Sequence, residues 1–240
     1  MSRIAIIAAM PGELKPLVRG WQHQLSQGVD LWRWKFDEGE WIAACAGAGV
    51  DAAARAFAQV EKIGTPDFVI SVGWAGALTP ALETGRVYSP SGVIDARTGE
   101  RFQVAIWNLE QWLVTSPIVA GEAEKLRLAS TYKASLVDME AAGVARLAQM
   151  RGIPFYCFKG ISDGYNDQMP DFNRFITANG QFKLGHFIVS RIYRPWQWPA
   201  LIRMGENSKK AAQSIAESLL DFLDERGHIR RRNGYPNFSG

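Results

Sequence analysis

Short hydrophobic runs alternate with longer amphipathic segments along the chain up to about residue 165. An apolar run of about four to eight residues bounded by turn residues predicts a buried strand, and apolar residues three and four positions apart predict a helix. The predicted strands are 4–9, 31–36, 41–46, 67–72, 86–89, 92–94, 102–106, 112–115 and 154–161, and the predicted helices are 11–19, 52–63, 122–129 and 139–150. Buried strands separated by helices indicate a single α/β domain, in which helices flank a central mixed, twisted β-sheet.

The C-terminal part of the chain follows a different pattern. From about residue 170 the sequence is typical of helices, and the last predicted helix covers 207–224. We therefore expect one domain over residues 1–225, followed by a flexible basic tail at 226–240. This tail explains the net charge of +3, because four of the 27 basic residues lie in it and the rest of the chain has 23 basic against 24 acidic residues. A basic tail is a weak signal for binding nucleic acid, so we expect no nucleic-acid partner.

The composition argues against several further classes of protein. Cys45 and Cys157 lie in apolar runs, which predicts two small buried hydrophobic residues in a reducing cytoplasm. The three histidines are far apart in the sequence, so we expect no metal site. No segment approaches ~18 uninterrupted apolar residues, and none is expected to span a membrane. The apolar run at 4–10 is at the short limit for a signal-peptide core and fits a strand as well.

The residues that follow each predicted strand are the candidates for a binding site, because ligands of open α/β sheets bind at the carboxyl ends of the strands. One candidate is the turn at 47–52, which has the GxGxxA spacing of a dinucleotide-binding turn. Such a site would need an acidic residue about 20 positions further on, at the end of the next strand. That strand ends in Val72-Gly73-Trp74, so a tight turn that packs a helix against a strand is the better interpretation.

Carboxylates stand at three other positions where a strand is expected to end. Glu13 is either a general base or a first-turn residue that complements the helix dipole. Asp138 and Glu140 are close in sequence, so only one of them can easily face a cleft, where it could accept hydrogen bonds from the vicinal hydroxyls of a ribose. The alternative is that Asp138 caps a helix and Glu140 is solvated. Asp163 follows Ser162, where it is either a proton donor or a turn residue.

Four segments together carry a resemblance to a known family. They are Ile4–Glu13 (IAIIAAMPGE), Val72–Gly76 (VGWAG), Val137–Ala141 (VDMEA) and Ile161–Asp163 (ISD). The chain resembles the purine nucleoside phosphorylase and nucleosidase family, in particular the branch that contains methylthioadenosine/S-adenosylhomocysteine nucleosidase. The resemblance implies the single-domain fold of that family, a small-molecule nucleoside as substrate, a homo-oligomer with a dimer favoured, and a cytoplasmic location.

The resemblance also implies roles for individual residues in breaking the bond between C1′ of a ribose and N9 of a purine. Glu13 matches the glutamate that activates the hydrolytic water, and Asp163 matches the acid that protonates N7 of the leaving base, with Ser162 helping to position it. Glu140 matches the acceptor for the ribose hydroxyls. The other residues implied to bind substrate are Met10, Trp74, Ala75, Gly76, Ile118, Met139 and Lys159. No metal and no cofactor is implied, and phosphate would be a co-substrate only in a phosphorylase.

The chain departs from the family pattern at several positions. Trp74 replaces the usual serine of a Ser-Ala-Gly loop, Lys159 replaces an arginine, and Ser71 stands where the phosphorylases have a phosphate-binding arginine. Two losses at the phosphate position favour hydrolysis, although binding of phosphate by Lys159 or by an arginine without a family match keeps the phosphorolytic alternative open. Another alternative is a nucleoside-binding module without turnover, in which Trp74 blocks the position of water or phosphate. Pro117-Ile118 lies near the position of the base-stacking aromatic of the family and leaves the base preference open.

Segments 137–140, 152–155 and 194–203 are similar to the hopanoid-associated phosphorylases. That resemblance implies the removal of adenine from adenosylhopane, a nucleoside with a large lipid at its 5′ position. Residues 186–203 mix aromatic and aliphatic side chains with three arginines, a composition typical of an element at a bilayer interface. Peripheral contact with the inner face of the membrane is one interpretation of this segment, and a core or dimer-interface helix with snorkelling arginines is the other.

Overall fold

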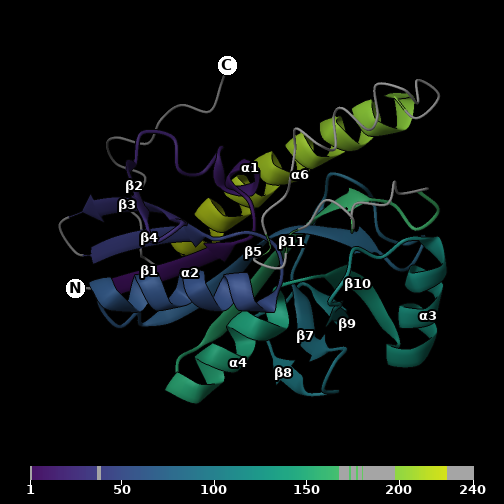
Figure 1. Ribbon diagram of the computed structural model, residues 1–240, viewed down its shortest axis with the longest axis horizontal. Coiled ribbons are helices and arrows are strands. Elements are labelled where there is room, and N and C mark those ends of the chain that lie inside the picture. The colour runs from purple at the N-terminus through teal and green to yellow at the C-terminus, as the bar shows by residue number, and fades with distance from the viewer. Residues whose placement is uncertain are drawn as a thin grey trace.

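A twisted β-sheet runs through the molecule, with helices on both of its faces (Figure 1). The computed structural model describes residues 2–36, 39–167, 173, 177, 180 and 198–225, and in the last range it describes side chains from residue 202 onward. Helices α2 (Val50–Ile63) and α4 (Ala141–Arg151) cover one face of the sheet, and α1 (Pro11–Leu14) and α6 (Trp198–Glu225) cover the other. This arrangement confirms the expected α/β fold with a central mixed sheet.

The described strands form one continuous sheet around β5. Its order is β2-β3-β4-β1-β5-β10-β9-β7-β8, and β11 pairs with both β5 and β6. β1 and β11 run parallel to β5, whereas β10 pairs antiparallel with the last residues of β5. The strands are β1 (Ser2–Ala8), β2 (Gln22–Ser26), β3 (Val29–Phe36), β4 (Gly39–Cys45), β5 (Phe68–Ala77), β6 (Val87–Tyr88), β7 (Pro90–Asp95), β8 (Arg101–Gln103), β9 (Leu109–Thr115), β10 (Ala134–Asp138) and β11 (Phe155–Asp163).

The pairing register brings three strand ends together at one glycine. Gly76 of β5 lies opposite Val137 of β10 and also opposite Asp163 of β11. β1 ends close by, since its residue Ile7 pairs with Ser71 of the same β5. The carboxyl ends of β1, β5, β10 and β11 therefore meet in one region, which is where a ligand site is expected in such a sheet.

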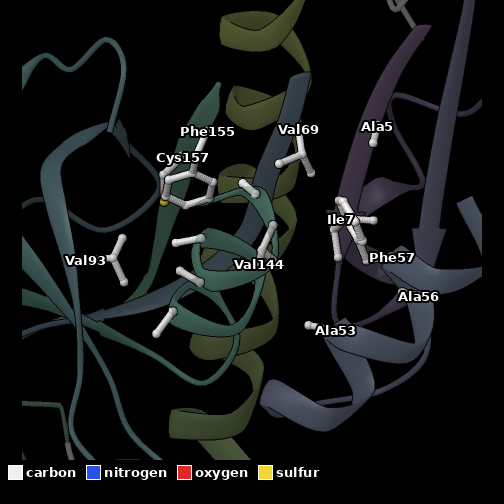
Figure 2. Close-up of a cluster of buried hydrophobic side chains, with 14 of the residues drawn as sticks. Ala5, Ile7, Ala53, Ala56, Phe57, Val69, Val93, Val144, Phe155 and Cys157 are labelled. Carbon is white, nitrogen blue, oxygen red and sulfur yellow. The ribbon is translucent and has the colours of Figure 1, made fainter. Parts of the chain in front are cut away.

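Small side chains allow the helices to pack closely on the first face (Figure 2). Ala53, Ala56 and Phe57 of α2 and Val144 of α4 are buried against the sheet. Gly143 of α4 is needed where the two helices meet, because a Cβ atom there would lie 2.7 Å from Cγ1 of Val50. Figure 2 also places Cys157 in this core, and Cys45 is likewise buried, which confirms the expected burial of both cysteines.

Helix α6 packs on the second face through its C-terminal half. Ile215, Leu219 and Phe222 are buried there, and the ring of Phe222 lies 4.9 Å from that of Tyr156 and 5.2 Å from that of Phe158. The earlier turns of the helix extend past the edge of the sheet (Figure 1), where Ile202 is exposed. Helix α6 includes the expected helix at 207–224 and begins earlier, at Trp198.

Four elements differ most from the sequence-based expectation. Strand β10 was not among the predicted strands, although a strand was expected to end before Glu140. Strand β2 was not expected, because four of its five residues are polar and all but the last are exposed. It forms at the sheet edge by pairing with β3. The expected helix at 11–19 ends as an α-helix at Leu14. Strand β5 continues past residue 72 to Ala77, since β11 and β10 supply backbone partners for Gly73–Ala77.

Helix α3 (Glu122–Tyr132) lies beside β10, away from the two faces described above. Among the helices described, none combines the length and the apolar composition that a membrane span requires. Within the same described ranges, no three side chains of the metal-binding types form a group that could hold an ion. The expected tail at 226–240 and most of the predicted interfacial segment at 186–203 lie outside the described residues.

We predict that Gly143→Ala destabilises the fold although alanine is the better helix former. The new Cβ would lie 2.7 Å from the Val50 side chain and 3.2 Å from its backbone atoms, so the two helices must separate. Overpacking of this kind costs typically ~1–3 kcal/mol. Urea denaturation measures the change, and Gly205→Ala is the control, because nothing lies within 4 Å of a Cβ at that helical position. Equal stability of the two variants would contradict the packing described here.

Candidate active site

A cavity of about 220 Å³ lies where the carboxyl ends of β1, β5, β10 and β11 meet. Its wall includes ten of the eleven predicted site residues, and Lys159 is the exception. Residues from the start of helix α6 complete the wall on one side. The described lining residues are Ala9, Met10, Glu13, Ala48, Trp74, Ala75, Gly76, Ile118, Val119, Ala120, Val137, Asp138, Met139, Glu140, Ser162, Asp163, Met204 and Ser208.

Glu13 is held by three backbone N–H groups from two elements. Its Oε2 atom accepts hydrogen bonds from the N–H groups of Ala9 and Met10, each at 2.8 Å, and its Oε1 atom accepts one from Trp74, also at 2.8 Å. The approach requires a glycine at position 73, where φ is +146° and a Cβ would lie 2.7 Å from Oε1. Burial raises the pKa of Glu13 above its ordinary value, and the three hydrogen bonds and Lys159 only partly offset this.

Asp138 and Glu140 have different surroundings, and this difference shows which of the two carboxylates is available to a ligand. Both oxygens of Asp138 are engaged: Oδ1 accepts a hydrogen bond from the Thr115 hydroxyl at 2.7 Å, and Oδ2 accepts one from the N–H of Ala141 at 2.9 Å. Glu140 receives a single described hydrogen bond, from the N–H of Gly49 to Oε1 at 2.8 Å. Glu140 is therefore the carboxylate with acceptor capacity left for a ligand.

Burial and repulsion from Asp138 raise the pKa of Glu140 to about 8, although Lys159 acts in the opposite direction. The surrounding protein groups therefore favour a largely protonated Glu140 near neutral pH. A ligand that donates hydrogen bonds to this carboxylate, or that carries positive charge beside it, would favour the ionised form. Vicinal hydroxyl groups and a sugar cation have these two properties.

Lys159 lies beneath the cavity and is absent from its described wall. Its side chain is fully buried, and its Nζ atom lies 2.8 Å from Oδ2 of Asp138. Burial is the largest single influence and would lower the pKa of Lys159, but the combined effect of Asp138, Cys157 and Glu140 outweighs burial and raises the pKa. The lysine that the sequence made a candidate for binding phosphate is thus paired with a carboxylate of the protein.

Asp163 also lines the cavity. Its Oδ1 atom accepts a hydrogen bond from the Ser162 hydroxyl at 2.7 Å, and its Oδ2 atom forms an ion pair with Nζ of Lys125 from α3. Lys125 is almost completely buried and also donates a hydrogen bond to the carbonyl oxygen of Gly164 at 2.7 Å. The carboxylate that faces the cavity is therefore held from behind by a buried ammonium group.

The sequence profile of the phosphorylase superfamily matches residues 3–107 and 102–183. The chain belongs to the phosphorylase superfamily. This confirms the family that four short segments indicated. Compared by sequence with the curated proteins, the chain has no significant match.

Several solved structures share the fold of this chain at low sequence identity. A 5′-methylthioadenosine/S-adenosylhomocysteine nucleosidase from Helicobacter pylori, bound to butyl-thio-DADMe-Immucillin-A, has a TM-score of 0.71 and 18% identity, over 94% of this chain and 99% of that chain. The futalosine hydrolase of Helicobacter pylori has a TM-score of 0.70 and 18% identity, over 93% and 98%. The 5′-methylthioadenosine nucleosidase of Arabidopsis thaliana has a TM-score of 0.71 and 18% identity, over 97% and 98%.

Trp74 gives this superfamily member a contact that the sequence did not indicate. Its indole passes over Gly12, where a Cβ would lie 3.1 Å from the ring, and its Nε1 atom donates a hydrogen bond to the carbonyl oxygen of Ser208 at 2.9 Å. Trp74 thereby joins β5 to helix α6 and brings Met204 and Ser208 into the cavity wall. These two residues were missed, because nothing in the local sequence of a distant helix shows which strand end it covers.

A second cavity of about 360 Å³ adjoins the first, since both are lined by Ala48, Ile118 and Met139. Its described wall also includes Arg97 and Ser116. The Gly49–Glu140 hydrogen bond joins the two walls, because Gly49 lines the second cavity and Glu140 lines the first. The second cavity therefore provides further space beside the first.

Lys125 is the other residue that the sequence reasoning missed. A helix over 122–129 was expected, but a lysine on a helix is almost always exposed, so the type of residue gave no sign that Lys125 is buried. Lys125 and Leu128 are three residues apart, and these two are the buried residues of α3. The helical spacing from Leu128 was therefore the signal that could have placed Lys125 on the inward face.

We predict that Glu140→Gln raises the melting temperature at about pH 9 and has a much smaller effect at about pH 5. The pKa of Glu140 is about 8 in the folded protein and near 4.5 when unfolded. Its ionisation therefore opposes folding; the penalty is absent below about pH 4.5 and fully present above about pH 8. Glutamine removes the charge and keeps an acceptor for the Gly49 N–H.

Thermal denaturation at the two pH values measures this effect. Glu110→Gln is the matched control, because Glu110 is an exposed carboxylate on β9. A Glu140→Gln protein that is no more stable than the wild type at pH 9 would contradict the buried charge described here.

Proposed function

We propose that this chain hydrolyses the N-glycosidic bond of an adenine-type purine nucleoside with a substituent at its 5′ position. The convergence of Glu13, Glu140 and Asp163 on one cavity carries the proposal. The chain is an enzyme of a superfamily that cleaves nucleosides, and the similar structures include nucleosidases and a hydrolase. The adjoining cavity supports a substrate that extends beyond the ribose.

In the proposed reaction, one carboxylate acts on each of the three reacting groups, which are the ribose, the water and the purine. As the C1′–N9 bond breaks, its electron pair leaves with the purine and positive charge develops on the ribose. Glu140 accepts hydrogen bonds from the ribose hydroxyls, and its ionised form stabilises that positive charge. Glu13 takes a proton from the water whose oxygen bonds to C1′, a role that suits a base with a raised pKa. Asp163 hands a proton to N7 of the purine, and Ser162 orients its carboxyl group.

The wall of the first cavity supports water as the nucleophile. Among its described residues there is no lysine and no arginine, whereas a phosphate dianion is ordinarily bound by such side chains. Lys159 is occupied by Asp138, and Ser71 is a small buried side chain on β5. Phosphorolysis, including the removal of adenine from adenosylhopane, is the alternative that the experiment below tests.

The proposed enzyme acts in the cytoplasm as a homodimer, as the family resemblance implied. Peripheral contact with the membrane through residues 186–203 also stays a prediction. The described part of that segment includes Ile202 and Arg203, which are exposed at the start of helix α6. Flotation of the protein with anionic vesicles tests the predicted membrane contact.

We predict that the wild-type protein releases adenine from methylthioadenosine or adenosine without phosphate. Chromatography of the free base measures the release. Glu13→Gln and Asp163→Asn should each lower kcat by about 10²–10⁴-fold, the usual effect of losing an acid or base, whereas the exposed Glu110→Gln should leave it unchanged. A strict requirement for phosphate would establish phosphorolysis. No release of base from any nucleoside, adenosylhopane included, would overturn the proposal.

Trp74→Ser distinguishes a working enzyme from an inactive binding module. If Trp74 blocks the attacking water, the wild type binds nucleosides without turnover and the variant gains activity. We expect the opposite, because the indole points to Gly12 and Ser208 and holds the wall of the cavity. The variant should show a higher KM than the wild type and a lower melting temperature. Trp74→Phe, which keeps a ring but loses the hydrogen bond, should have a KM and a melting temperature between those of the wild type and Trp74→Ser.

A further inference from the structure

A buried lysine stands directly behind the carboxylate proposed to protonate the leaving base. The Lys125 side chain is 1% exposed, and its ammonium group contacts Oδ2 of Asp163 and the carbonyl oxygen of Gly164. It is one of the largest fully buried side chains among the described residues. Its near neighbours on α3, Leu126 and Arg127, are exposed.

Stability alone does not account for this ion pair. Moving an ammonium group and a carboxylate out of water costs several kcal/mol each, and well-packed apolar residues of the same volume often serve a fold equally well. The sequence nevertheless places a lysine on the inward face of α3 and a glycine at position 76. A Cβ atom at Gly76 would lie 2.8 Å from Oδ2 of Asp163 and 3.2 Å from Cε of Lys125. The glycine thus leaves space for the ion pair.

The ion pair lies at the boundary of the cavity. Gly76 and Asp163 both line the cavity, whereas Lys125 does not. The other described hydrogen bond to the Asp163 carboxylate comes from the Ser162 hydroxyl and leads to Oδ1. Oδ2 therefore faces a proton-bearing ammonium group on one side and the glycine of the cavity wall on the other. Lys125 can reach a bound base only through Asp163.

We propose that Lys125 is a positioning residue that supplies, through Asp163, the proton that the departing purine receives. This proposal rests on the function proposed above. In the resting site the pair holds one acidic proton, on the ammonium group. A nucleoside that fills the cavity excludes water, and a low-dielectric surrounding favours the neutral pair, in which the Nζ–H bond is broken and an Oδ2–H bond is formed.

The proton then moves from Oδ2 to the purine nitrogen as the C1′–N9 bond breaks and its electron pair passes to the purine. The products at this end of the site are the protonated purine, an Asp163 carboxylate and a neutral Lys125 amine. The amine regains a proton from solvent after the purine leaves. No oxidant or other reactant is needed.

The test compares two substrates whose leaving groups differ in their need for a proton. A purine leaves as an unstable anion unless it is protonated, whereas 4-nitrophenyl riboside releases a stable nitrophenolate without protonation. Lys125→Met removes the proton and keeps an apolar stem. Lys125→Arg keeps a cation and its donors, but a guanidinium group does not give up a proton in proteins.

We predict that Lys125→Met and Lys125→Arg both lower kcat/KM for the purine nucleoside on the order of 10²-fold. Both should change kcat/KM for 4-nitrophenyl riboside by less than about threefold, since that reaction uses Glu13 and Glu140 but needs no acid. Arg127→Met is the matched control, because Arg127 lies on the same helix, is exposed and pairs with Glu124. It should leave both reactions unchanged.

Three results would overturn the inference while leaving the proposed function standing. The first is unchanged purine cleavage in Lys125→Met. The second is an equal loss of activity on both substrates, which would indicate a structural role. The third is recovery of purine cleavage in Lys125→Arg, which would indicate that the residue supplies charge and not a proton. A wild-type protein that cleaves neither substrate would overturn the proposed function and the inference with it.

Discussion

One buried ammonium group, that of Lys159, lies beneath the cavity and interacts with carboxylates from three parts of the chain. It is paired with Asp138 at 2.8 Å, and its charge partly offsets the rise in the pKa values of Glu13 and Glu140. One cation among three buried carboxylates leaves an excess of negative charge in a low-dielectric region, which the protein can relieve by keeping a proton. Burial and this excess of negative charge together raise the pKa of Glu140, and the chemistry of the site depends on both.

The carboxylates keep their positions because backbone N–H groups of other elements bind them. Gly49, at φ +97°, presents its N–H to Glu140, and the chain beyond Gly73 presents the N–H of Trp74 to Glu13. These contacts depend on the register of the sheet and on the approach of α2 to α4. The packing of small residues in the core therefore controls the geometry of the charged groups.

Much of the fold follows from local patterns, and the site follows only in part. Apolar runs identified β1, β4, β5 and β11, and the rule for strand ends located Glu13, Glu140 and Asp163. Strand β2 was missed because an exposed edge strand has no apolar pattern. The choice between Asp138 and Glu140, the burial of Lys159 and Lys125, and the contact of Trp74 with α6 depend on long-range packing. Pairings between residues far apart in sequence leave no mark in a single chain.

The most direct test of this account is the titration of the carboxyl groups themselves. Carbon-13 NMR of protein labelled at the side-chain carboxyl carbons of aspartate and glutamate would follow each group as pH changes. The account predicts one buried carboxyl group that titrates near pH 8, and this signal should be absent from Glu140→Gln. If instead every carboxyl group of the wild type has titrated by about pH 5, near the ordinary range, the charge imbalance on which the proposed chemistry rests does not exist.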